Sequence, residues 1–356
     1  MISVRVRKHF PPGRAAGSFA LDCEFTAQAG ITALWGPAGS GKTSILDAIA
    51  GFLRPDAGRI LLDDALVFDA ATGVHLEPRE RRCGYILPGY ALFPHLSLRR
   101  NLEFGARRLP RLERRRSVNE ALERFELSGA AARKPRELNR AERFRGALAR
   151  ALLTEPRVLL ADHPSLGACA PERAECHDML RRAPGELEIP VLLATTDLDE
   201  CLEAAERIIV LREGKVAQSG LTRQVIEQPA TADVARMLGI YVLLPAEIKA
   251  LDPSRNSSRI LVQQTELSGP YFPGHFLGDR VWLCVRPDQL FARPRDGKPG
   301  PNQIPAELIR VTEKVRSVRL DFSGDLAVEL PRAEYESQKH NKEWVVEFPP
   351  NALRVL

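Results

Sequence analysis

The sequence predicts an α/β fold for its first two-thirds and a smaller all-β domain for the rest. Apolar runs alternate with helical patterns up to about residue 238, which is typical of a mostly parallel sheet covered by helices on both faces. A glycine-rich loop joins the first apolar run to a helical stretch. After Leu238 the helical periodicity fades, and short β-rich runs with turn signals indicate a small β-barrel.

Four apolar runs carry the alternation in the first two-thirds of the chain. We interpret them as strands over Ile31–Trp35, Val158–Ala161, which ends on Asp162, Pro190–Thr195 and Ile208–Leu211. Helices are predicted over Ser44–Leu53 and Pro171–Arg182. Residues 92–157 are almost wholly helical and predict a helical insertion in the α/β core. The arginine-rich stretch Arg107–Arg116 inside it is interpreted as a solvated face rather than a binding site.

The last third of the chain has the pattern of a small β domain. Its β-rich runs are Arg259–Gln263, Arg280–Arg286, Ala306–Glu313, Arg316–Phe322, Leu326–Leu330 and Glu343–Phe348. The segment Pro294–Pro305, rich in Pro, Gly and charged residues, separates two groups of these runs. We therefore expect a boundary near residues 230–245, with domains at 1–235 and 236–356.

Composition and charge exclude several classes of protein. The chain has 356 residues, enough for about two domains, and its 51 Lys and Arg exceed its 46 Asp and Glu by five, which gives little reason to expect a nucleic-acid partner. No apolar run approaches the ~18 residues that span a bilayer, and Arg5, Arg7 and Lys8 stand where a signal peptide is apolar. The six cysteines form no C-x-x-C pair, so a reduced, cytoplasmic protein without a disulfide scaffold or structural zinc is expected.

The glycine-rich loop fits a phosphate-binding pattern at every fixed position. Gly36-Pro37-Ala38-Gly39-Ser40-Gly41-Lys42-Thr43 matches G-x-x-x-x-G-K-[ST], between an apolar strand and a helix. Glycines let the loop wrap so that backbone N–H groups face phosphate oxygens, and the helix adds its positive N-terminal end. Lys42 is expected to reach the β- and γ-phosphates of a nucleotide, and the Thr43 hydroxyl to coordinate Mg²⁺. A P-loop NTPase fold is therefore predicted.

Together with this loop, four further blocks of the sequence resemble the ATP-binding subunits of ABC transporters. The likeness covers roughly residues 15–235. The blocks are Arg79–Pro88 with Ala91–Ser97, similar to the family's Q-loop region, Leu138–Glu142 with Arg145–Leu152, similar to its signature motif and helix, Val158–Asp162, similar to Walker B, and Leu192–Glu200, similar to its switch region. The resemblance implies an ABC-type domain that binds ATP, with Asp162 holding Mg²⁺ through water.

Within that family, the sequence of Gly84–Ser97 and the β-rich tail most resemble those of importers of molybdate and related oxyanions. The tail resembles the OB-like C-terminal domains (TOBE or Mop-like) of those subunits. The likeness rests on its pattern of short β-rich runs and on the segment Val285-Arg286-Pro287-Asp288. The resemblance implies a subunit peripheral on the inner face of the cell membrane, paired with itself or another ABC subunit. A transmembrane permease subunit is its expected partner, with Ala91–Ser97 facing it. Whether the tail binds a small oxyanion or mediates subunit contacts stays open at this point.

By position, most of the family's catalytic groups are replaced in this sequence. The Q-loop glutamine falls at Pro88, the glutamate after Walker B at His163 and the switch histidine at Thr196. The signature's serine and two glycines and the D-loop aspartate fall at Asn139, Arg140, Ala141 and Cys169. Because a general acid or base contributes ~10²–10⁴-fold to a rate, the joint loss of these groups predicts weak hydrolysis or none.

Two functions remain in competition on these observations. The first is the ATP-binding subunit of an oxyanion importer, in which Mg-ATP binding is coupled to transport. The alternative is a non-hydrolysing pseudo-ATPase that uses ATP as a structural ligand in a regulatory or scaffolding module. His163 either serves as the base, since an ordinary pKa near ~6.5 suits that role, or only fills the position. Arg140 either acts as an arginine finger or obstructs the approach of backbone to phosphate.

Overall fold

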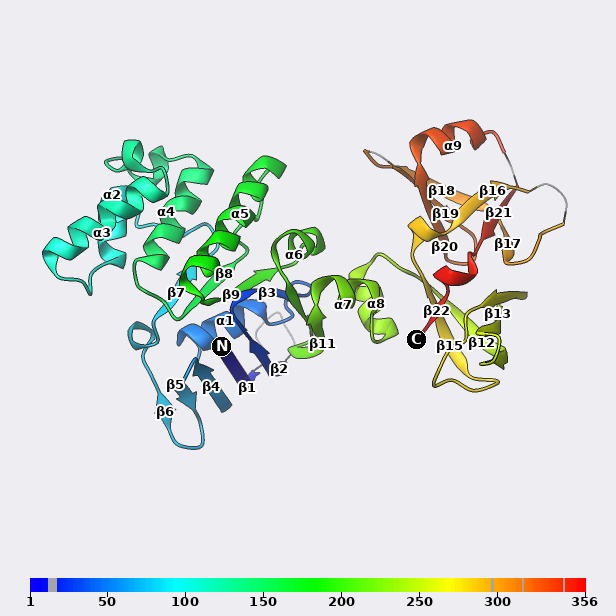
Figure 1. Ribbon diagram of the computed structural model, residues 1–356, viewed down its shortest axis with the longest axis horizontal. Coiled ribbons are helices and arrows are strands. Elements are labelled where there is room, and N and C mark those ends of the chain that lie inside the picture. Colours follow the sequence, from blue (N-terminus) through cyan, green and yellow to red (C-terminus); the bar gives the residue numbers. More distant parts are fainter. Residues whose placement is uncertain (12–17, 296–297, 316, 342) are drawn as a thin grey trace. The chain divides into compact units, whose positions relative to one another are not determined.

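The computed structural model describes residues 1–11, 18–295, 298–315, 317–341 and 343–356. Two compact units make up the chain, Met1–Gln228 and Pro229–Leu356 (Figure 1). The second unit starts before residue 236 because helix α8 (Ala232–Leu238) packs against two strands of that unit. In the described part of the chain, no helix is long and apolar enough to cross a membrane.

A six-stranded sheet forms the centre of the first unit, in the order β11-β10-β3-β9-β8-β7. Five neighbouring strands are parallel, and β11 pairs antiparallel with β10. The bounds are β3 (Gly30–Trp35), β7 (Cys83–Ile86), β8 (Val158–Asp162), β9 (Pro190–Thr195), β10 (Arg207–Arg212) and β11 (Lys215–Leu221). All four predicted strands are present, and β8 and β9 are buried along their whole length, as expected for a parallel sheet covered on both faces.

The first unit has a second, antiparallel sheet that was not predicted from the sequence. Its order is β2-β1-β4-β5-β6. The bounds are β1 (Ile2–Phe10), β2 (Phe19–Ala27), β4 (Ala57–Leu62), β5 (Ala65–Asp69) and β6 (Val74–His75). In β1, Ile2, Val4 and Val6 are buried while Arg5 and Arg7 are exposed. This alternation is a strand signal, and it accounts for the charged residues within β1.

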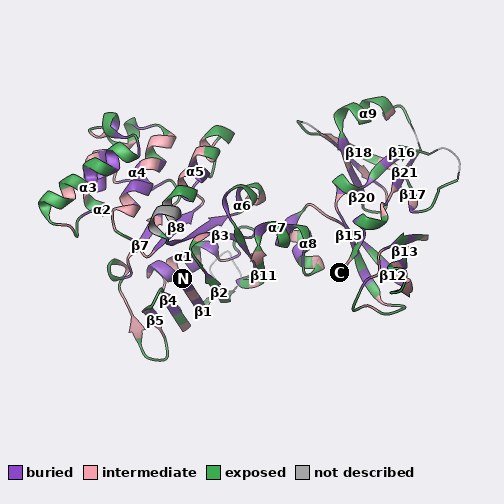
Figure 2. Ribbon diagram, viewed as in Figure 1, coloured by how far each residue is buried: buried purple, intermediate pink, exposed green. Residues whose placement is uncertain are grey.

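Helix α1 (Lys42–Ala50) lies between the two sheets. Its buried apolar residues share one hydrophobic core with residues of β1, β4, β8 and β9. Figure 2 colours the chain by burial. The helix starts two residues before the predicted Ser44, directly after the glycine-rich loop. The other helices of the unit are α2 (Leu98–Gly105), α3 (Arg111–Arg124), α4 (Arg140–Leu152), α5 (Ala170–Leu187), α6 (Leu198–Ala204) and α7 (Thr222–Glu227). Helices α2 to α4 form the predicted helical insertion.

The second unit is built from antiparallel strands around a core of its own. Its sheets have the orders β14-β13-β12-β15-β22, β16-β21-β17 and β18-β19-β20. The bounds are β12 (Val242–Asp252), β13 (Ser257–Val262), β14 (Thr265–Gly269), β15 (Arg280–Val285), β16 (Phe291–Pro294), β17 (Gln303–Ala306), β18 (Leu308–Glu313), β19 (Ser317–Phe322), β20 (Leu326–Pro331), α9 (Arg332–Gln338), β21 (Trp344–Glu347) and β22 (Arg354–Val355). Each of the six predicted runs overlaps one or two of these strands. Arg316 lies outside the described residues. The fold class is therefore as the sequence predicts.

Candidate functional site

The predicted site residues follow neighbouring parallel strands at one edge of the central sheet. Trp35, the last residue of β3, pairs with Thr195, and Asp162, the last residue of β8, pairs with Ala194. The carboxyl ends of parallel strands meet at the same edge, which is where open α/β sheets bind ligands. The glycine-rich loop, His163 and Thr196 therefore leave the sheet at this edge.

The loop Gly36–Thr43 requires glycine at its tightest points. A Cβ on Gly36 would lie 2.3 Å from the carbonyl oxygen of Leu211, on the neighbouring strand β10. Gly41 caps the N-terminus of α1 with φ 101°, in the left-handed region that glycine adopts at little cost. The backbone can therefore turn closely into the helix, with the free N–H groups of its first turn at the loop.

Lys42 is buried within the loop, with 4% of its surface exposed. Its Nζ donates to the carbonyl oxygens of Gly36 and Pro37, at 2.8 and 2.9 Å, and to Ser40 Oγ at 3.3 Å. Burial lowers the pKa of Lys42, and the charge of Asp162 opposes that effect. These contacts hold the ammonium group on the inner side of the loop, where Gly36, Pro37 and Ser40 converge.

Thr43 and Asp162 form a pair of oxygen ligands suited to Mg²⁺. The Thr43 hydroxyl donates to Asp162 Oδ2 at 2.9 Å, and the carboxylate is fully buried. Its second oxygen, Oδ1, has no hydrogen-bond partner among the described residues. An unpartnered buried carboxylate oxygen is costly unless a cation or water meets it. Hard oxygen donors of this kind are what Mg²⁺ prefers, so the residues fit the ion that the sequence predicts there.

His163 sits next to this carboxylate in a strained backbone conformation. Its φ is 48°, its N–H donates to the Ala194 carbonyl at 2.9 Å, and its Nε2 lies 3.9 Å from Asp162 Oδ1. The imidazole is thus close to the predicted magnesium ligand. Pro88, where the resemblance predicts the Q-loop glutamine, is exposed and carries no polar side-chain atom. Thr196 is exposed, and its carbonyl accepts from Trp35 Nε1 at 3.2 Å.

The loop after β8, residues 163–169, is held by two side chains from outside the sheet. Arg140, the first residue of α4, donates to the carbonyls of Leu166 and Gly167. The Tyr90 hydroxyl donates to the Pro164 carbonyl at 3.1 Å. The Arg140 guanidinium therefore contacts a loop of its own chain, which neither hypothesis for this residue anticipates.

A buried polar cluster on the other side of the same loop was missed by sequence reasoning. Glu200, with 2% of its surface exposed, accepts from Ser165 Oγ at 2.5 Å, and His177 Nε2 lies 3.1 Å from the same Oε1. Burial tends to raise the pKa of Glu200, but hydrogen bonds from His177, Ser165 and Thr195 bring it below its usual range. The cluster joins α5 and α6 to the loop. The signal available in sequence was Glu200 at the end of the switch block, but its partners are remote in sequence.

Comparison with known proteins agrees with this geometry. The sequence model of the family described as "ABC transporter" matches residues 22–166 of the chain. The chain is 37% identical over 239 residues to Molybdenum import ATP-binding protein ModC of Rhodospirillum rubrum, covering 67% of this chain and 65% of that relative. It is 34% identical over 315 residues to the protein of the same name from Rhizobium etli, covering 87% of this chain and 88% of that relative.

A relative named for a different substrate matches nearly the full length of the chain. The chain is 35% identical over 346 residues to Sulfate/thiosulfate import ATP-binding protein CysA of Acinetobacter baylyi, covering 94% of this chain and 92% of that relative. Among solved structures, the dimeric structure of a bacterial ABC transporter cassette matches with a TM-score of 0.54 at 26% identity. That match covers 63% of this chain and 99% of the other.

Proposed function

The chain belongs to the family of ATP-binding proteins of ABC importers, and from this premise we propose that it binds Mg-ATP and couples that binding to oxyanion import through a separate transmembrane permease subunit. One observation carries the proposal: the buried Asp162 and the Thr43 hydroxyl stand beside a phosphate loop that fits its pattern at every fixed position, and Asp162 Oδ1 has no hydrogen-bond partner among the described residues. The regulatory or scaffolding alternative receives no support from the relatives described above, which are all named import proteins.

Each part of the loop has a distinct task in nucleotide binding. Backbone N–H groups of Gly36–Thr43 bind phosphate oxygens, and Lys42 neutralises the β- and γ-phosphates. Thr43 would hold Mg²⁺ directly and Asp162 would hold it through water; the ion, when bound, neutralises phosphate charge. Burial of Lys42 strengthens its electrostatic interaction with a phosphate, because the surrounding dielectric is lower than in water.

Hydrolysis by this chain is slow in this proposal. An attacking water needs an acceptor for its proton and a group that orients it. Pro88 supplies no polar side-chain atom, and His163 has its Nε2 near the Asp162 carboxylate. A cation held by that carboxylate disfavours a protonated imidazole beside it, so His163 is a poor acceptor for the proton of water. The chain then stays bound to its nucleotide, and coupled to transport, for the long time that each slow turnover takes.

Molybdate is the proposed transport substrate, and it would cross the membrane through the membrane-embedded partner. Support comes from the relatives in Rhodospirillum rubrum and Rhizobium etli, whose names specify molybdenum import. The name of the relative in Acinetobacter baylyi specifies sulfate and thiosulfate, so sulfate is the competing substrate to test. The chain would act as a dimer on the inner face of the cell membrane, bound to the permease subunit.

Uptake and nucleotide binding, measured on matched variants, test the proposal. Cells lacking the gene are complemented with the wild-type chain, with Lys42→Ala, or with Lys215→Ala, an exposed lysine on β11. Labelled molybdate and labelled sulfate are supplied separately, and binding of fluorescent ATP with Mg²⁺ is measured on the purified chains. We expect Lys42→Ala to abolish molybdate uptake and weaken ATP binding about 10–100-fold, the loss typical of a hydrogen bond to a charged group.

Other outcomes would overturn specific parts. Restored sulfate uptake without molybdate uptake would replace the substrate. Wild-type ATP binding by Lys42→Ala would contradict the assigned phosphate loop. Uptake of both anions at the level of uncomplemented cells, with ATP binding intact, would contradict the importer function.

A further inference from the structure

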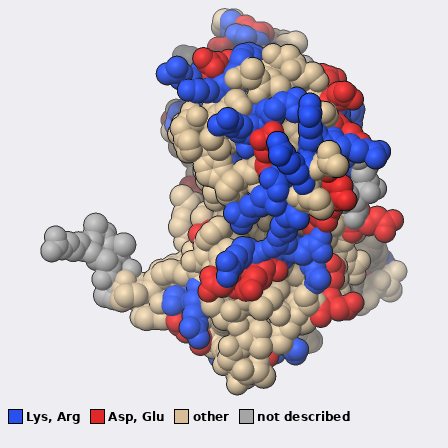
Figure 3. Space-filling model, turned by 90° about the vertical axis from the view of Figure 1, so that its left-hand side faces the viewer, with Lys and Arg blue, Asp and Glu red and all other residues tan. Residues whose placement is uncertain are grey.

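The excess positive charge of the chain lies in one short segment of the helical insertion. Residues 99–116 hold eight arginines and two glutamates, an excess of six positive charges, whereas the whole chain has an excess of five. Within this segment, the run Arg107–Arg116 has a single acidic residue, Glu113. Figure 3 views the side of the first unit that carries α2 and α3 and shows Lys and Arg in a band across it. Concentrated charge of one sign attracts partners of the opposite sign.

The outer side of the first two turns of α3 is the part of this segment that faces solvent. Arg111, Leu112, Arg115 and Arg116 are exposed there, and we call these four residues the α3 patch. Among the described residues, Arg111 and Arg115 form no ion pair. Arg116 pairs with Glu120 at 2.8 Å, in an exposed contact of a kind that contributes little to stability. The patch therefore presents three guanidinium groups that an external anion can reach.

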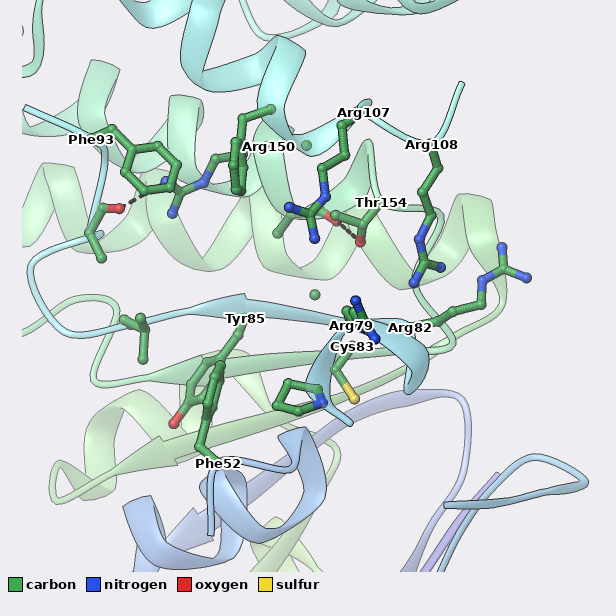
Figure 4. Close-up of a pocket in the computed structure, with 17 residues that line it drawn as sticks. Phe52, Arg79, Arg82, Cys83, Tyr85, Phe93, Arg107, Arg108, Arg150 and Thr154 are labelled. Atoms are coloured by element: carbon green, nitrogen blue, oxygen red, sulfur yellow. Dashed lines mark hydrogen bonds between the residues drawn. The ribbon is translucent and has the colours of Figure 1, made fainter. Parts of the chain in front are cut away.

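The α3 patch is separate from the pocket drawn in Figure 4. Arg107 and Arg108, at the start of the arginine run, line that pocket of about 510 Å³, whereas none of the four patch residues lines it. The patch also shares no residue with the phosphate loop Gly36–Thr43. Neither the proposed nucleotide site nor this pocket accounts for the patch.

The rest of the helical insertion holds the backbone under the patch in place. The inner side of α3 is buried, with Val118 and Leu122 among its buried residues. Arg114, the half-buried arginine of the run, donates through Nη2 to the carbonyls of Arg107 and Leu109, both at 3.0 Å. These contacts fix the turn that leads into α3. A surface whose backbone is already ordered loses little conformational freedom when it binds a partner.

Leu112 indicates which kind of anionic partner fits the patch. Its side chain is 84% exposed, although single exposed leucines are common on protein surfaces. Here the leucine follows Arg111 directly and precedes Arg115 by one helical turn. An anionic membrane surface offers phosphates to the arginines and an apolar layer beneath them to the leucine. The backbone of a nucleic acid offers phosphates without such a layer.

We propose that the α3 patch docks directly on anionic phospholipid headgroups. Arg111, Arg115 and Arg116 bind the phosphates, and Leu112 inserts between the headgroups. The inference rests on the proposed function, which places the chain at the inner face of the membrane, and it adds a contact with the lipid that needs no permease subunit. This part of the arginine run is then a docking surface rather than the solvated face expected from the sequence.

Sedimentation of the purified full chain with lipid vesicles tests the proposal without ATP or the permease. One set of vesicles is phosphatidylcholine alone, and in the other a third of the lipid is phosphatidylglycerol. The patch variants are Arg111→Gln/Arg115→Gln/Arg116→Gln and Leu112→Ser. Binding is measured at about 0.1 M and about 1 M salt, where the Debye length is about 10 Å and about 3 Å.

A control variant removes the same charge from other surfaces of the chain. It is Arg207→Gln/Arg223→Gln/Arg310→Gln, at three exposed arginines on β10, α7 and β18. Duplex DNA is offered to the same chains at the same phosphate concentration. Binding of fluorescent ATP with Mg²⁺ checks that each variant is folded, since none of the substituted residues lies in the phosphate loop.

We expect the wild-type chain to sediment with the phosphatidylglycerol vesicles and not with phosphatidylcholine alone. The triple patch variant should bind about 100-fold more weakly, because each arginine near an anionic membrane contributes about fivefold. Leu112→Ser should bind about tenfold more weakly, because it removes a side chain that enters the apolar layer. The control variant should bind much like the wild-type chain, and about 1 M salt should abolish binding.

Several results would overturn the proposal. They are no sedimentation of the wild-type chain with the anionic vesicles, equal binding by the wild-type chain and the triple patch variant, and equal losses in the patch and control variants. Binding to duplex DNA that depends on the patch, while vesicles do not bind, would also overturn it. Unchanged binding by Leu112→Ser would contradict the insertion of the leucine. ATP binding and molybdate uptake are measured separately, so failure here is distinguishable from failure of the proposed function.

Discussion

At the scale of single residues, Arg140 stands where the sequence resemblance places a glycine of the family's signature motif. Its guanidinium donates to the carbonyls of Leu166 and Gly167. The arginine thus positions the loop that begins with His163. An arginine so engaged is tied to its own chain, and its length serves contacts that a glycine cannot make.

Replacing Arg140 with alanine should loosen this loop. Hydrogen bonds from a charged donor are worth about 1.5–3 kcal/mol, so amide exchange across residues 163–169 should accelerate about tenfold or more. Hydrogen–deuterium exchange with mass spectrometry measures this directly. Arg143→Ala, an exposed arginine on the same helix, is the control. Equal exchange in Arg140→Ala and the wild-type chain would remove the positioning role.

The phosphate loop was predictable because its chemistry is local. Gly36, Gly41, Lys42 and Thr43 lie within eight consecutive residues, and each needs only its neighbours to be identified. Glu200 depends on Ser165 and His177, which are 35 and 23 residues away. No spacing rule connects such residues, so only the packing of α5 and α6 on the loop reveals the cluster.

At the scale of elements, the same distinction explains which strands the sequence predicts. Strands β8 and β9 are continuous apolar runs, which are visible without knowledge of partners. In strand β1, buried and exposed residues alternate. The exposed arginines between Ile2, Val4 and Val6 make this apolar pattern harder to recognise. The antiparallel sheet that this strand belongs to was therefore missed, although its period-two pattern is present in the sequence.

The contact between α5 and α6 should make stability depend on acid pH. The folded pKa of Glu200 lies below its ordinary value of 4.5, so its carboxylate stabilises the fold above that pH. This stabilisation is lost as pH falls through the lowered folded value. Glu200→Gln should lower the free energy of unfolding at neutral pH by about 1–3 kcal/mol and flatten the loss of stability in acid.

Calorimetric melting temperatures from neutral pH down to acid pH check this expectation. Asp199→Asn removes an exposed carboxylate from the same helix and should keep the steepness of the wild-type profile. A Glu200→Gln profile as steep as that of the wild-type chain would show that this carboxylate does not link folding to pH.

At the scale of the whole molecule, each of the two units has a hydrophobic core of its own. The first unit carries the phosphate loop, which binds the nucleotide in the proposed function. Helix α4 contacts the loop after β8 through Arg140, its first residue. Arg150, near the end of this helix, donates to the carbonyls of Ala91 and Tyr90. The predicted nucleotide-binding groups lie in the same unit as Pro88, His163 and Thr196, the positions where catalytic groups are predicted to be missing.

Single-turnover phosphate release from Mg-ATP tests this combination of binding and slow hydrolysis most directly. The chain is kept in excess, bound nucleotide is quantified in the same samples, and Lys42→Ala provides the blank. We predict that the wild-type chain retains its ATP largely unhydrolysed and releases phosphate only slowly, well below about 1 s⁻¹. Release at about 1 s⁻¹ or faster, as in ordinary enzymes, would contradict the prediction and assign the missing catalytic role to His163 or another group.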